Sequence, residues 1–152
     1  MATRPGLFGK LPAHGDFVRR NLPRSFVSPW DSWLSEGMLA VPETSWAAWR
    51  FHLAAGLCGP AAAAGIVAPS EDAVGRHFPV TLVALDVELV PPEIWFAELE
   101  SLAGLGLDAD SLVAALPEVP ADGMAPDRES RFWALDGREY PMEAGFAALL
   151  VP

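Results

Sequence analysis

The sequence has a single cysteine and few basic residues, and each scarcity excludes a class of protein. Cys58 cannot form an internal disulfide, and without neighbouring ligands it indicates neither a metal site nor a redox pair, so we expect a small buried hydrophobe. No apolar run approaches the roughly 20 residues that span a bilayer. Lys10, Arg19 and Arg20 interrupt the N-terminus where a secretory signal needs its apolar centre, so we expect a cytoplasmic protein.

Basic residues are half as numerous as acidic ones, with 10 Lys and Arg against 20 Asp and Glu, and their distribution is uneven. Residues 1–85 carry a net charge of +1 and residues 86–152 a net charge of −11. Nucleic acids and anionic membranes are bound by Lys and Arg patches, so the balance argues against both as partners. The acidic half either keeps an apolar protein soluble, which we favour, or meets a basic protein partner.

The length of 152 residues predicts one domain, residues 1–152, with a core that needs no disulfide or metal. Strand-like runs occupy residues 7–11, 16–19, 49–53, 61–68, 80–85 and 131–135, and a last apolar run follows at 145–151. Short turns join most of these runs. We therefore expect an α+β fold with a central, largely antiparallel sheet flanked by helices. Alternation in residues 49–53 predicts that Arg50 and His52 share a solvent face.

Helix starts and stops are marked by capping residues. Ser28 followed by Pro29 predicts the start of a helix whose apolar stripe includes Trp30 and Trp33, and we expect both indoles to pack in the core. Pro92 starts a second helix, with Ile94 on its apolar face, and Gly104 stops it. Asp108 or Asp110 can cap a third, short helix that Pro117 closes.

Two polar, turn-rich segments, residues 9–17 and 69–79, are set between apolar runs, and we expect them to converge at one edge of the sheet. A charged side chain beside so much apolar sequence must be paired or face solvent. Either Arg76 pairs with Asp16 or Asp72 and pins the loops, which we favour, or these residues form a partner-binding surface, and the two interpretations are compatible. Gly15 and Gly75 are expected to allow positive φ or close chain approach.

The candidate site is thus defined in three groups. The partner-binding or loop-pinning residues are Asp16, Asp72, Arg76, His77 and Ser70; the structural turn residues are Gly9, Pro12, Gly15, Pro69, Gly75 and Pro79; and the core aromatic residues are Phe17, Trp30, Trp33, Trp49, Phe51 and Phe78.

An enzyme interpretation is less favoured. Ser70, Asp72 and His77 include the residue types of a hydrolytic triad, but no Gly-x-Ser-x-Gly elbow is present, and one short loop could hardly supply the geometry. His14 and His52 are interpreted as lone surface histidines because no compact ligand spacing surrounds them. Phosphate-binding glycine motifs are also missing, so we expect no catalytic residues, no metal and no cofactor.

Three segments, in this order and spacing, resemble the TagF family of type VI secretion-associated proteins. They are Phe8-Gly9-Lys10-Leu11-Pro12 with Gly15-Asp16-Phe17, then Trp30-Asp31-x-Trp33, then Pro69-Ser70-x-Asp72-x-Val74-Gly75-Arg76-x-Phe78-Pro79. With Trp49-x-Phe51, the resemblance covers roughly the first two-thirds of the chain. His77 and Val80 depart from the pattern, in which an aromatic residue and Leu are usual. The acidic C-terminal third carries no matching motif.

The resemblance implies a cytoplasmic regulator and not an enzyme. Proteins of this kind restrain assembly or firing of the secretion machine after translation, against a threonine-kinase pathway, and are linked with a forkhead-associated scaffold protein. Some are fused to a phosphatase domain, for which we expect no room in this chain. The alternatives are a small hydrolase using Ser70 and His77, or a structural subunit of the secretion assembly.

Overall fold

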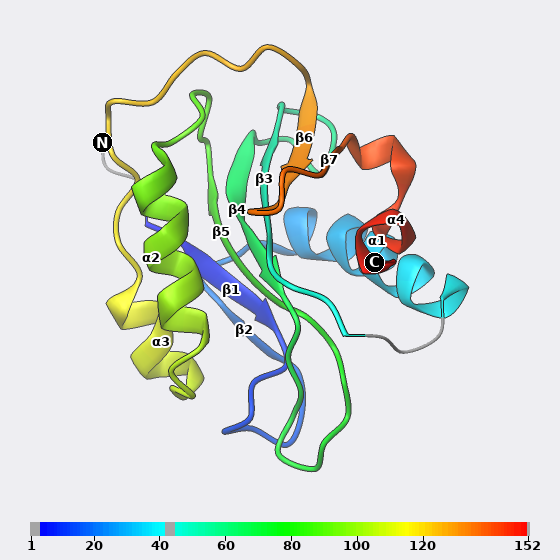
Figure 1. Cartoon of the computed structure of the whole chain (residues 1–152). Helices are drawn as coiled ribbons and strands as arrows, with labels where there is room; N and C mark the ends of the chain where they lie inside the picture. Colours follow the sequence, from blue (N-terminus) through cyan, green and yellow to red (C-terminus); the bar gives the residue numbers. More distant parts are fainter. Residues whose placement is uncertain (1–3, 42–44, 152) are drawn as a thin grey trace.

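Apolar runs with turns between them fold into one antiparallel sheet, and a computed structural model describes residues 4–41 and 45–151 (Figure 1). Within these residues seven strands lie in the order β2-β1-β5-β4-β3-β6-β7. They are β1 (Gly6–Gly9), β2 (Val18–Arg20), β3 (Trp49–Leu53), β4 (Ala63–Ala68), β5 (Val80–Leu85), β6 (Ser130–Trp133) and β7 (Glu139–Tyr140). The described helices are α1 (Arg24–Ala40), α2 (Glu93–Ala103), α3 (Ala109–Ala115), the short 3₁₀ helix η1 (Met142–Ala144) and α4 (Phe146–Leu150).

Helices cover both faces of the sheet. In Figure 1, α2 and α3 lie on one side of it, and α1 and α4 lie on the other. Because successive strand residues point to opposite faces, Ile66 and Leu82 join one apolar cluster with α2, whereas Val67 and Val83 join a second with α1. The predicted α+β fold, with an antiparallel sheet flanked by helices, is confirmed.

Burial of Arg50 and His52 contradicts the prediction of a solvent-facing side for β3. Helix α2 covers this side, and the Arg50 guanidinium forms ion pairs with Glu93 and Glu100 of that helix. The Nε2 atom of His52 lies 2.8 Å from the carbonyl oxygen of Val87. The alternation of polar and apolar residues in β3 thus distinguishes two buried faces, one of which contains paired polar groups.

Helices α2 and α3 have the predicted boundaries. Pro92 precedes the first residue of α2 and Gly104 follows its last residue. Asp108 caps α3, because its carboxylate accepts a hydrogen bond from the backbone N–H of Ser111 at 2.8 Å. The predicted place of Ile94 is wrong: it is exposed, and Phe96 is buried in the α2 core face with Trp95 and Leu99.

Helix α1 begins earlier than its capping signals predicted. Ser28 does not cap it, since the helix starts at Arg24, and Pro29 lies inside it. A proline at this place removes only one hydrogen bond, to the carbonyl of Ser25 in the first turn. Burial of Phe26 between helix and sheet holds that turn in place. The last apolar run also differs from the strands before it, because it forms α4 against α1.

Acid is expected to weaken the fold through His52. Burial disfavours the charged imidazole and lowers the pKa of His52 below its ordinary value near 6.5, against the opposing effects of the Val87 carbonyl and Glu88. The unfolded chain then binds this proton more readily than the folded chain, so stability falls as the pH drops through about 6.5.

Urea unfolding midpoints between about pH 7 and pH 5 test this expectation. The variant His52→Gln keeps an N–H donor near Val87 without a titrating ring, so its midpoint should fall less than that of the wild type over this range. Ser45→Gln, a change at an exposed position without a titrating side chain, is the control and should retain the wild-type pH dependence. An unchanged slope in His52→Gln would contradict the assignment.

Candidate functional site

Strand register brings the two motif loops, residues 10–17 and 69–79, to the same end of the sheet. Gly9 at the end of β1 lies opposite Val80 at the start of β5, and Ala68 at the end of β4 lies opposite the same residue. The chain therefore leaves β1, leaves β4 and enters β5 at one place. Both loops project from this end, at the bottom of the view in Figure 1.

The carboxylate of Asp72, which is 2% exposed, holds the two loops together. Its Oδ1 accepts hydrogen bonds from the backbone N–H groups of Val74 and Arg76, both at 3.0 Å. Its Oδ2 lies 2.8 Å from Nε of Arg76 and 3.4 Å from Nζ of Lys10. We call Lys10, Asp72 and Arg76 the Asp72 cluster, in which one carboxylate is shared by cations from both loops.

The environment of Asp72 favours its charged form. Desolvation alone would raise the pKa of Asp72, but the N–H groups of Arg76 and Val74 and the Arg76 guanidinium stabilise the anion and bring the pKa down to about 2. The side chain is thus a permanent anion at neutral pH. A group in this state acts as a fixed electrostatic anchor and is poorly suited to accept or release protons there.

Three further hydrogen bonds join the loops through backbone carbonyls. Nη2 of Arg76 donates to the carbonyl oxygen of Gly15 at 2.7 Å, and Oγ of Ser70 donates to that of Lys10 at 2.6 Å. The N–H of Ala73 donates to the carbonyl of His14 at 2.7 Å. Each loop therefore satisfies polar groups of the other.

Asp16 lies outside this set of contacts. Its side chain is exposed and accepts the N–H of its neighbour Phe17 at 2.7 Å. Of the two carboxylates considered as partners for Arg76, Asp72 forms the ion pair. The structure thus brings Asp72, Arg76 and Ser70 together with Lys10, which the sequence motif contained but which was not among the candidate residues.

Phe17 departs from the expectation of a core aromatic residue. It is 47% exposed, although its ring makes an edge contact with Phe78 at 4.8 Å between centroids and stacks on Phe8 at 6.0 Å. Nζ of Lys10 lies 4.9 Å from the centre of the Phe17 ring, a cation–π contact. The loops extend beyond the helices (Figure 1), and this side chain remains about half exposed. The remaining aromatic candidates are buried or half-buried, namely Trp30, Trp33, Trp49, Phe51 and Phe78.

Two glycines have a geometric reason for their place. Gly9 has φ +138°, and a Cβ there would lie 2.0 Å from the carbonyl oxygen of Pro79. Gly75 has φ +86° in the turn that Asp72 caps. The reason given for Gly15 is wrong: its φ is not positive, and a Cβ would meet nothing within 4 Å. Gly15 instead supplies the carbonyl oxygen that Arg76 binds.

The other turn candidates lie around the same place. Pro12 is in the exposed turn of the first loop, Pro69 is exposed at the start of the second, and Pro79 is buried against Gly9.

Ser70 and His77 contribute differently to the loop. The Ser70 hydroxyl donates to Lys10, and both oxygens of Asp72 accept from residues of the two loops. His77 is exposed, and its Nε2 lies 3.8 Å from a carboxylate oxygen of Glu71. A Ser-His-Asp relay would require the same atoms that now hold the loops together.

His14 has a role that the surface-histidine interpretation missed. Its Nε2 accepts the N–H of Ala109, the first residue of α3, at 3.0 Å. The first N–H groups of a helix have no partner within the helix and must find acceptors elsewhere. The sequence marks the start of α3 clearly but gives no sign of which distant side chain supplies this acceptor.

An apolar groove of about 940 Å³ lies beside the second loop. The C-terminal end of α1, the segment before β3, the loop itself and α4 form its walls. Its lining residues are Met38, Val41, Ser45, Trp46, Pro69, Ser70, Gly75, Arg76, His77, Phe78, Pro79, Phe146 and Leu150. No sequence pattern predicts this groove, since its walls come from segments more than a hundred residues apart.

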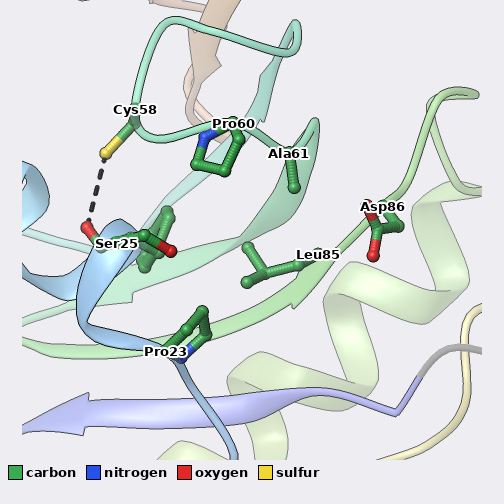
Figure 2. Close-up of a pocket in the computed structure, with 8 residues that line it drawn as sticks. Pro23, Ser25, Cys58, Pro60, Ala61, Leu85 and Asp86 are labelled. Atoms are coloured by element: carbon green, nitrogen blue, oxygen red, sulfur yellow. Dashed lines mark hydrogen bonds between the residues drawn. The ribbon is translucent and has the colours of Figure 1, made fainter.

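A smaller cavity, of about 280 Å³, lies at the opposite end of β5 (Figure 2). Cys58 and Pro60 lie on one side of it, and Pro23 and Ser25 lie on the other. The Cys58 thiol donates to the carbonyl of Phe26 at 3.8 Å, and burial raises the pKa of this thiol to about 12. A thiol that stays protonated is neither a nucleophile nor a metal ligand, so Cys58 belongs to the core.

No group of three or more His, Cys, Asp or Glu side chains in residues 4–41 and 45–151 is arranged to hold a metal ion. Within the same ranges, every helix is too short or too polar to cross a bilayer.

Comparisons with known proteins identify a family and similar solved structures. A model of the TagF N-terminal domain, described as type VI secretion system-associated, matches residues 6–119. The crystal structure of PA0076 from Pseudomonas aeruginosa PAO1 is similar, with a TM-score of 0.77 and 28% sequence identity over 97% of this chain and 94% of that chain. No curated protein matches. The structural similarity thus extends beyond the family match into the acidic C-terminal third.

Gly9→Ala is expected to destabilise the fold, because the added Cβ would overlap the Pro79 carbonyl at a backbone angle that side chains rarely adopt. We expect a loss of more than about 2 kcal/mol in the free energy of unfolding. Gly15→Ala is the matched control and should change it by less than about 1 kcal/mol, because its Cβ meets open space. Equal effects in chemical unfolding would contradict the close-approach argument.

Asp72→Asn is expected to lower the melting temperature, because Lys10 and Arg76 would lose the anion that they share. The folded-state pKa of Asp72 lies near 2, below its value in the unfolded chain, so wild-type stability is lost as the pH falls from about 4 to about 2. This part of the acid dependence should be weaker in Asp72→Asn. Asp16→Asn, which changes an exposed carboxylate in the facing loop, should leave it in place, and thermal melts over that pH range make the comparison.

Proposed function

The chain belongs to the TagF family of type VI secretion system-associated proteins, and from that membership we propose that it is a non-enzymatic repressor of this secretion system. It acts after translation, in the cytoplasm, and limits assembly or firing of the machine by protein–protein contact. The matched family domain covers three-quarters of the chain and includes both motif loops, α1 and the sheet strands β1 to β5. The proposal therefore concerns the part of the molecule that carries the family pattern.

The observation that carries the proposal is the Asp72 cluster. Asp72 of the motif forms ion pairs with Lys10 and Arg76, and the Ser70 hydroxyl donates to the carbonyl of Lys10, so these groups hold the two loops in one arrangement. The tip so fixed presents two exposed apolar side chains, Phe17 and Val74, next to an apolar groove. A preorganised surface with exposed apolar groups is typical of a site of protein contact.

The family association implies components of the secretion system as partners, and we propose a forkhead-associated scaffold protein as the one that this chain contacts. Binding would withhold the scaffold from the assembling machine and so oppose the threonine-kinase pathway that promotes firing. The negative net charge of the chain favours a protein over nucleic acid or an anionic membrane as its target.

Deletion of the gene is expected to raise secretion of a type VI effector above the wild-type level, and a plasmid copy of the wild-type gene should reverse this increase. Effector protein in culture supernatants, measured against its total amount in the cells, checks the expectation. Unchanged or reduced secretion would contradict repression. Reduced secretion would favour a structural subunit, which should also purify with the machine in fixed stoichiometry.

A Ser70→Ala copy separates contact from hydrolysis. Repression by this variant should equal that of the wild type, provided that its melting temperature shows an intact fold, because the hydroxyl serves a structural hydrogen bond. Loss of repression by a folded Ser70→Ala chain would favour the hydrolase alternative.

A further inference from the structure

The apolar groove beside loop 69–79 has a charge character opposite to that of the whole chain. Acidic residues outnumber basic ones by two to one in the sequence. Among the groove-lining residues that the structure describes, however, none is acidic, and loop 69–79 contributes Arg76 and His77. The other walls are mainly apolar, with Trp46, Phe146 and Leu150 among them. The described lining of the groove therefore differs in charge from the acidic C-terminal half, although Glu71 of the same loop lies 3.8 Å from Nε2 of His77.

Arg76 is held in position before any partner arrives. Its Nε is bound to Asp72 and its Nη2 to the carbonyl of Gly15, whereas 60% of its side chain is exposed. These two bonds use two of the five N–H donors of a guanidinium, and its planar form suits pairing with a carboxylate. Arg76 can thus donate hydrogen bonds to a partner's carboxylate with little loss of side-chain conformational entropy.

The Asp72 cluster has a positive charge in excess. Lys10 and Arg76 both lie within 3.4 Å of the same Asp72 oxygen, so two cations share one anion. Asp16 and Glu71, the other acidic residues of the two loops, are not among the described lining residues, where Arg76 is the one arginine and no carboxylate is present. Residues 86–152, in contrast, carry a net charge of −11 and would repel an acidic segment. Electrostatics would therefore favour the groove over the surface formed by residues 86–152 for such a segment.

We infer that the groove binds a short segment of a protein partner in which bulky apolar side chains enter the groove and an adjacent Asp or Glu pairs with Arg76. Grooves of this kind bind amphipathic segments through a few apolar anchors, and the charged pair fixes their direction. The inference rests on the proposed function, since it names the chemistry by which a contact-dependent regulator recognises its partner.

The test uses the full chain and libraries of short synthetic peptides that combine Leu, Phe or Trp with Asp or Glu. In matched libraries Asn and Gln, or Lys, replace the acidic residues. Fluorescence polarisation should show binding of the acidic library, weaker binding of the amide library and none of the lysine library. The indole N–H signal of Trp46 in an NMR spectrum should shift on binding of the best acidic peptide, because Trp46 lines the groove.

Variants of the full chain test whether the peptide carboxylate contacts Arg76 in the groove. Arg76→Gln is expected to weaken the best acidic peptide about tenfold or more, as the loss of a desolvated charge pair does. Ser45→Glu introduces a carboxylate into the groove lining at an exposed position and should weaken it similarly, whereas Ser45→Gln, of equal size without charge, should not. Arg128→Gln, which removes an exposed arginine between Asp127 and Glu139, is the control for net charge and should bind as the wild type does.

The outcomes separate this inference from the proposed function. Equal binding of the acidic and lysine libraries, or equal effects of Ser45→Glu and Ser45→Gln, would overturn the inference. If Arg76→Gln lowers the melting temperature, the two Ser45 variants alone provide the test. Binding of indole-3-acetate without any peptide would indicate a small-molecule site and overturn the choice of occupant. Full repression of secretion by Ser45→Glu would refute the binding of the partner in the groove but not the proposed repressor function. Peptide binding that depends on Arg76, together with secretion that is unaffected by gene deletion, would refute the repressor function and leave the inference about the groove in place.

Discussion

The organisation of the loop end depends on one buried anion. A carboxylate removed from water is costly unless hydrogen bonds and opposite charges compensate it, and Asp72 obtains this compensation from Val74, Arg76 and Lys10. Lys10 belongs to the loop after β1, and the other two belong to the loop after β4. Lys10 therefore joins the anion to the first loop, which couples the positions of the two loops, and Arg76 is held beside the groove.

Much of the architecture follows from local signals. Pro92 and Gly104 delimit α2, Asp108 caps α3, and the β-branched and leucine run at residues 80–85 forms β5. The boundaries of these elements follow local rules of capping and strand formation, and tertiary packing is consistent with the same boundaries. The approach of the two glycine-containing loops, in contrast, depends on the pairing of Gly9 in β1 with Val80 in β5, which are distant in the sequence.

Other features depend on contacts between distant segments. The polar residues of β3 are buried because α2 covers them and brings two glutamates to Arg50. The alternation of polar and apolar residues in the sequence does not distinguish such a buried polar face from a solvent-exposed one. Helix α1 starts before its apparent cap because Phe26 packs in the core, and the last apolar run becomes α4 because it packs against α1. Phe17 remains half-exposed because no helix extends over the loop tip. The groove cannot be detected in the sequence, because its wall segments come together only in the folded chain.

The pairing of β1 with β5 has a consequence for synthesis of the protein. Gly6–Gly9 lies next to Val80–Leu85 in the sheet, and β3 lies between β4 and the much later β6. The first strand can therefore pair with β2 soon after synthesis, but it leaves the ribosome well before its other neighbour, β5, exists. Until about half of the nascent chain has emerged, the edge of β1 that pairs with β5 is open to chaperones and to unintended partners, and the loop end can form only afterwards.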